Sequence, residues 1–128
     1  MTIVYNDDIL FFDGINVLDL ALSNQTPFYL YSEKIITNNF LAYQKSFKDN
    51  PHLICYSVKA NSNLSILSLL AELGSGFDIV SGGELSRVIQ AGGDPSKTVF
   101  SGVGKTEEEI KFALSKNIMC FNIESRDE

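Results

Sequence analysis

The chain has 128 residues, of which 45% are hydrophobic and 20% charged, a composition typical of one globular domain or part of a larger one. Its formal net charge of −6 disfavours contact with nucleic-acid phosphates, so we expect no nucleic-acid partner. Because the N-terminus lacks a secretory signal and no apolar run reaches roughly 18 residues, we expect a cytoplasmic protein without a membrane partner.

Residues 1–25 hold two short apolar stretches on either side of a turn signal. The stretches are Ile9–Phe12 and Ile15–Leu22, and the Asp13-Gly14 pair between them is typical of a two-residue hairpin turn. This segment precedes the repeating pattern of the rest of the chain, so we expect it to pack separately.

From Thr26 onward, short apolar or β-branched runs alternate with amphipathic segments. Five of the runs are predicted strands, and they begin at residues 28, 53, 77, 98 and 119, a spacing of 25, 24, 21 and 21 residues. The predicted strands are Phe28–Tyr31, Leu53–Val58, Phe77–Val80, Thr98–Phe100 and Met119–Ile123. Strands that alternate with helices at this spacing indicate βαβ units and a parallel sheet.

The segments between the predicted strands carry helix signals. Asn63 is a predicted N-cap, and Gly74 is the predicted glycine just past the end of the same helix. Ser81 and Thr106 each have a glutamate three residues later, so each predicts a capping box at the start of a helix. These signals place a helix after the second, third and fourth predicted strands.

The repeat length fits two α/β folds, a (β/α)8 barrel and a doubly wound sheet. Strand order separates them, since a barrel has sequential order and a flavodoxin-like sheet has the order 2-1-3-4-5. A barrel runs to about 250 residues, so five strands by residue 119 make only about its first half. The chain stops at Ser125–Glu128, where the next helix should begin, so we expect a fragment that is inactive and poorly folded by itself.

Lys59 is the candidate catalytic residue, because it ends a predicted strand and barrels carry their catalytic groups at the carboxyl ends of strands. Alternation places Lys59 on one face with Cys55 and Ser57, and Tyr56 and Val58 on the helix side. A partly desolvated lysine at this place offers a neutral amine for Schiff-base chemistry. The alternative is a lysine that leaves a strand into a solvated loop, and spacing by itself favours that alternative.

Four segments resemble, in the same order and at the same spacing, the pyridoxal-phosphate (PLP) dependent amino-acid decarboxylases with an alanine-racemase-like barrel. The segments are Thr26–Tyr31, Tyr56–Asn61, Leu70–Leu85 and Val99–Lys105. The resemblance covers residues 26–128 and implies the first strands and helices of a PLP-binding (β/α)8 barrel. It implies that Lys59 carries the cofactor, PLP, and that the substrate is a small-molecule amino acid.

The resemblance also implies roles for two carboxylates. Asp78 is expected beside PLP and Lys59, the alternative being a structural carboxylate that binds backbone N–H groups. Glu84 is expected near the active centre, although its place in the Ser81 capping box would explain it without chemistry. The Ser81–Glu84 turn, with its two glycines, is similar to members that convert meso-2,6-diaminopimelate to L-lysine. The open alternatives are a related decarboxylase of another amino acid and a non-catalytic flavodoxin-like module.

Further expectations concern parts outside the repeating pattern. The resemblance implies that residues 1–25 pack on a β-rich domain that this chain lacks, and that the complete enzyme is a homodimer. No metal site is expected, because His52 is the single histidine and Cys55 and Cys120 are far apart in sequence. Gly102–Thr106 does not fit a phosphate-binding P-loop, since Val99 occupies the position of its first glycine.

Overall fold

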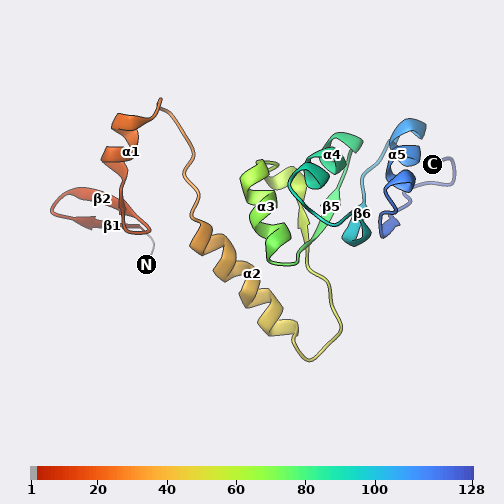
Figure 1. Cartoon of the computed structure of the whole chain (residues 1–128), viewed down its shortest axis with the longest axis horizontal. Helices are drawn as coiled ribbons and strands as arrows, with labels where there is room; N and C mark the ends of the chain where they lie inside the picture. The colour runs from red at the N-terminus through yellow and green to blue at the C-terminus, as the bar shows by residue number, and fades with distance from the viewer. Residues whose placement is uncertain (1–2) are drawn as a thin grey trace. The chain divides into compact units, whose positions relative to one another are not determined.

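The computed structural model describes residues 3–128 and divides into two compact units between Asn38 and Asn39 (Figure 1). Helix α2 (Glu33–Phe47) begins in the first unit and ends in the second. Among the described residues, no helix combines the length and the apolar character needed to cross a membrane.

The first unit contains a three-stranded antiparallel sheet and a short helix. Its elements in chain order are β1 (Ile3–Asn6), β2 (Ile9–Phe12), β3 (Ile15–Asn16) and α1 (Val17–Ser23). β2 pairs with both neighbours, and Asp13 and Gly14 join it to β3 with φ angles of 51° and 83°. Positive φ at both central residues is the requirement of a type I′ hairpin turn, so the predicted turn is confirmed.

The second unit contains a four-stranded parallel sheet in which a helix follows each of the first three strands. Its remaining elements are β4 (Cys55–Ser57), the 3-10 turn η1 (Val58–Ala60), α3 (Leu64–Glu72), β5 (Gly76–Ile79), α4 (Gly82–Gln90), η2 (Pro95–Lys97), β6 (Thr98–Phe100), α5 (Glu107–Ser115) and β7 (Cys120–Phe121). The strand order is β4-β5-β6-β7, with every neighbouring pair parallel. Sequential order confirms the predicted parallel α/β arrangement, is the order expected of the first part of a (β/α)8 barrel, and contradicts the flavodoxin-like alternative.

The predicted helix boundaries at α3 and α5 are confirmed. The side chain of Asn63 accepts a hydrogen bond from Ser65 N at 2.9 Å, and Gly74 has a φ of 84°. Thr106 Oγ1 accepts from Glu109 N at 3.3 Å while Glu109 Oε2 accepts from Thr106 N at 3.0 Å, which completes the capping box. Both helix starts therefore follow from local hydrogen bonding by residues next to them in sequence.

One face of the parallel sheet packs against the helices and forms the core. Val58, Phe77, Ile79 and Phe100 point to this face and have 0% of their surface exposed. The helices supply the buried residues Ile66, Leu67, Leu70, Leu85, Val88 and Ala113. Burial of each large apolar side chain stabilises the fold by about 1.5–3 kcal/mol. The opposite face carries the polar residues considered below.

The predicted first strand, Phe28–Tyr31, is wrong. These residues have no regular secondary structure, and no strand among residues 3–128 pairs with them. Tyr29 is 91% exposed, although the segment has the aromatic character that is common in strands. The physical reason is that a strand exists only where another strand binds its backbone groups. The predicted strand Met119–Ile123 is likewise paired only over Cys120–Phe121.

Candidate active site

Lys59 lies in the turn η1, two residues after Ser57, the last residue of β4. Val58 before it points into the core and is 0% exposed, whereas Lys59 itself is exposed. Within residues 3–128, the Lys59 side chain makes no hydrogen bond and no ion pair. The structure therefore places an amine without a protein partner at the carboxyl end of a parallel strand.

The backbone that follows Lys59 is held by two side chains that the sequence did not reveal. Tyr56 Oη donates to the carbonyl oxygen of Asn61 at 3.1 Å, and Arg87 Nε on α4 donates to the carbonyl oxygen of Ser62 at 2.7 Å. The contact of Arg87 spans 25 residues of sequence, so no local pattern could have indicated it. Together the two contacts fix the chain between η1 and α3.

Asp78 lies on β5 opposite Ser57 of β4, at the same end of the sheet as Lys59. Its Oδ2 accepts a hydrogen bond from Ser57 Oγ at 2.9 Å, and its Oδ1 accepts one from Ser101 Oγ at 2.5 Å. Asn122 Nδ2 in turn donates to Ser101 Oγ at 2.9 Å. The partners of Asp78 are therefore hydroxyl groups and not the backbone N–H groups of the structural alternative.

Glu84 binds the end of the strand that carries Asp78. Its Oε2 accepts from Val80 N at 2.8 Å, while Ser81 Oγ accepts from Glu84 N at 3.2 Å. The predicted capping box at Ser81 is therefore half right. A full box needs the glutamate on the N–H group of Ser81, and here the side chain reaches one residue farther back, which ties β5 to the first turn of α4.

A buried ion pair lies at the carboxyl ends of β6 and β7. Lys105 Nζ donates to Glu128 Oε1 at 2.6 Å and to the carbonyl oxygens of Gly102 and Asn122, each at 2.7 Å. The side chains of Lys105 and Glu128 are only 1% and 7% exposed. The hydrogen bond from Lys105 is the largest cause that holds the pKa of Glu128 below its ordinary value. The sequence did not reveal this ion pair, because Lys105 and Glu128 are 23 residues apart.

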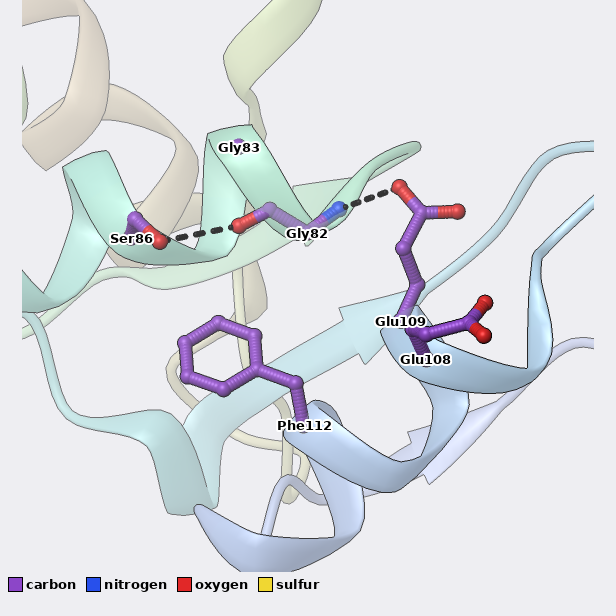
Figure 2. Close-up of a pocket in the computed structure, with 6 residues that line it drawn as sticks. All are labelled: Gly82, Gly83, Ser86, Glu108, Glu109 and Phe112. Carbon is purple, nitrogen blue, oxygen red and sulfur yellow. Dashed lines mark hydrogen bonds between the residues drawn. The ribbon is translucent and has the colours of Figure 1, made fainter.

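A shallow hollow of about 390 Å3 lies between the N-terminal ends of α4 and α5 (Figure 2). Glu109 Oε1 accepts from Gly82 N at 2.8 Å across it, and this N–H group is the main cause of the lowered pKa of Glu109. The protein's own carboxylate thus occupies the N-terminus of α4. The lining includes none of Lys59, Asp78 and Glu84, so the hollow is separate from the candidate site.

Comparisons with known proteins identify the family. Residues 33–128 match the pyridoxal-binding domain of the pyridoxal-dependent decarboxylases. The chain is 58% identical, over 122 residues, to a diaminopimelate decarboxylase of Vibrio cholerae. The aligned residues are 95% of this chain and 29% of that protein. The chain therefore spans about three tenths of the length of this curated relative.

Two solved structures are similar to nearly the whole chain. Diaminopimelate decarboxylase from M. jannaschii in complex with L-lysine has a TM-score of 0.92 and 39% identity, covering 97% of this chain and 30% of that one. Diaminopimelate decarboxylase from Helicobacter pylori, also in complex with L-lysine, has a TM-score of 0.83 and 54% identity. The match covers 86% of this chain and 28% of that one. By the match over residues 33–128, the chain belongs to the pyridoxal-dependent decarboxylase family, whose cofactor is the one that the sequence predicted.

Proposed function

We propose that this chain is the cofactor-binding part of an enzyme that decarboxylates meso-2,6-diaminopimelate to L-lysine, with Lys59 as the residue that holds PLP. The observation that carries the proposal is the position of Lys59, an exposed amine two residues after the end of β4 and one strand away from the carboxylate of Asp78. The names of the relatives support the substrate. Because the chain spans only 29% of its curated relative, the activity belongs to a longer protein.

The residues at the carboxyl ends of the strands fit a cofactor that carries an aldehyde. Lys59 supplies the amine that such a group requires, and Tyr56 and Arg87 fix the backbone that follows it. When bound, PLP supplies the electron sink for the bond that breaks as carbon dioxide leaves. The protein's task at this site is to bind the cofactor and to orient it.

Asp78 and Glu84 are proposed to contact the cofactor. The carboxylate of Asp78 is partly exposed and fixed by two hydroxyl donors, so it can pair with a cationic group beside Lys59. Glu84 uses Oε2 for Val80 N, and within residues 3–128 its other carboxylate oxygen accepts no hydrogen bond, so it can make a second contact. Glu84 thus combines a structural bond with a proposed place at the site.

The remaining expectations belong to the complete protein. We propose that the parallel sheet continues into a closed (β/α)8 barrel, that the enzyme is a homodimer and that it is cytoplasmic. The first unit exposes apolar side chains that need a covering surface, among them Ile3 at 57%, Tyr5 at 70% and Leu22 at 79%. These exposures support the proposal that residues 1–25 pack on a β-rich domain.

The test is a substrate panel on the full-length enzyme. Purified protein with PLP is given meso-diaminopimelate, lysine, ornithine and arginine, and carbon dioxide and amine products are quantified. We expect release only from diaminopimelate, and none from Lys59→Ala, while the exposed-lysine control Lys45→Ala keeps full activity. If another amino acid is turned over preferentially, the proposed substrate is wrong and the assignment to the family stands. If no amino acid is turned over, the proposed activity is contradicted.

A further inference from the structure

A line of side-chain hydrogen bonds crosses all four parallel strands at their carboxyl ends. It starts at Ser57, the last residue of β4, and continues through Asp78 on β5. It then reaches Ser101 and Asn122, which directly follow β6 and β7. The sheet register places these residues side by side, since Ser57 is opposite Asp78 and the next strands continue in sequential order. Of the members of this line, Ser101 has so far been described only as a hydroxyl donor to Asp78, and Asn122 has no role in the site as proposed so far.

The donors in this line all point toward Asp78. Ser101 has a single hydroxyl hydrogen and gives it to Asp78 Oδ1, so its oxygen is free to accept the amide hydrogen of Asn122. Ser57 gives its hydrogen to the other oxygen, Oδ2. Each carboxylate oxygen therefore has one donor and keeps a second lone pair. This fixes the plane of the carboxylate and leaves it able to accept from a cation.

Asn122 is itself fixed through its backbone. Its N–H group donates to the carbonyl oxygen of Phe100 at 2.9 Å, and its carbonyl oxygen accepts from Lys105 Nζ at 2.7 Å. Lys105 is 1% exposed and is held in place by Glu128. The side chain of Asn122 is exposed, but its backbone is held next to Ser101 by these two hydrogen bonds, one of them from the buried side chain of Lys105.

We propose that Ser101 and Asn122 are positioning residues that orient the carboxylate of Asp78 for the cofactor, with Lys105 holding Asn122 in place. The inference rests on the proposed function, because orientation of Asp78 affects the reaction only if Asp78 contacts the cofactor. A hydroxyl–carboxylate bond as short as that between Ser101 and Asp78, 2.5 Å, belongs to the strong, charge-assisted class. Its loss should therefore be measurable.

The experiment compares Ser101→Ala and the isosteric Asn122→Asp with the wild type in the full-length holoenzyme. Ser86→Ala is the matched control, because Ser86 is exposed on α4 and donates only to the carbonyl oxygen of Gly82 in its own helix. The readouts are the dissociation constant of PLP, the absorbance maximum of the bound cofactor, kcat at saturating PLP and the Tm of the cofactor-free protein.

We expect both variants to weaken PLP binding by about tenfold, shift the absorbance maximum and lower kcat, and Ser101→Thr to recover most of the loss because it keeps the hydroxyl. A structural role alone would lower Tm and leave the spectrum and kcat of the loaded enzyme unchanged, and that result would overturn the inference. If the wild type itself neither binds PLP nor releases carbon dioxide, the proposed function fails instead.

Discussion

Ser57 and Asp78 stand opposite each other on the neighbouring parallel strands β4 and β5, and the hydroxyl of Ser57 donates to Asp78 Oδ2 at 2.9 Å. Lys59 follows Ser57 by two residues, in the turn that ends β4. The pairing of the two strands therefore brings the candidate lysine and the candidate carboxylate to one edge of the sheet, although 19 residues of sequence separate them.

Gly76 should not tolerate a side chain. A Cβ at this position would lie 2.6 Å from the carbonyl oxygen of Lys97 and 2.7 Å from Cys55 Sγ, so Gly76→Ala should destabilise the protein by about 1–3 kcal/mol or more. The matched variant is Gly83→Ala, whose Cβ would have Ser81 Oγ as its nearest neighbour at 3.7 Å. Chemical denaturation of the two variants checks this, and equal stabilities would contradict the packing described.

Arg87 should stabilise the backbone after Lys59. Arg87→Ala removes the 2.7 Å bond from Nε to the carbonyl oxygen of Ser62, and we expect a loss of about 1.5 kcal/mol in the free energy of unfolding. Amide hydrogen exchange of residues 59–62 should speed up, which mass spectrometry can measure. The exposed Arg126 provides the control Arg126→Ala. Unchanged exchange in Arg87→Ala would show that the turn does not depend on this contact.

Glu109 should contribute stability that depends on pH. The N–H groups of Gly82 and Thr106 hold its pKa in the folded protein below the ordinary value of 4.5. A depressed pKa stabilises the fold above pH 4.5, and this contribution is lost as the pH falls through the folded pKa. Glu109→Gln should therefore lower Tm at pH 7, and its difference from the wild type should shrink below pH 4.5.

The control for this pH series is Glu107→Gln, which removes an exposed carboxylate that pairs with Lys111, an exposed residue as well. Exposed pairs within one helix contribute little, so Glu107→Gln should change Tm only slightly at any pH. A difference between Glu109→Gln and the wild type that stays constant from pH 7 to pH 3 would argue against the bond from Gly82.

Lys105 should matter more for stability than an exposed lysine. Lys105→Ala leaves Glu128, which is 7% exposed, without its cation and frees the carbonyl oxygens of Gly102 and Asn122. An unpaired buried charge is strongly destabilising, so we expect Tm to fall by several degrees, whereas Lys111→Ala changes it little. Scanning calorimetry of the two variants decides this, and a similar Tm for both would contradict the buried pair.

The sequence carried the information for those elements that depend on neighbouring residues. β6 begins and ends where the apolar run Thr98–Phe100 predicts, and Asn63 and Thr106 cap the helices that they were expected to cap. The predicted strand Leu53–Val58 is shorter in the structure, since β4 covers only Cys55–Ser57 and Lys59 lies in the turn after it, while Val58 is buried as expected. Local hydrogen bonding and apolar periodicity are sufficient for such features.

Contacts between distant residues could not be found this way. Ser101 binds Asp78 across 23 residues of sequence, and Asn122 binds Ser101 across 21, so nothing in the sequence next to either residue marks it. The prediction of a strand at Phe28–Tyr31 was wrong for a related reason. The composition of this segment favours a strand, but a strand also needs a neighbouring strand to pair with, and composition does not reveal one. The resemblance to a family located Lys59 and Asp78, but not the residues that hold them.

The central claim is that Lys59 holds the cofactor, and borohydride reduction tests it most directly. Full-length protein is incubated with PLP, reduced, digested and mapped by mass spectrometry. We expect one modified peptide, labelled at Lys59, and no label in Lys59→Ala. Label on a different lysine, with Lys59 unmodified in protein that binds PLP stoichiometrically, would contradict the assignment of the site.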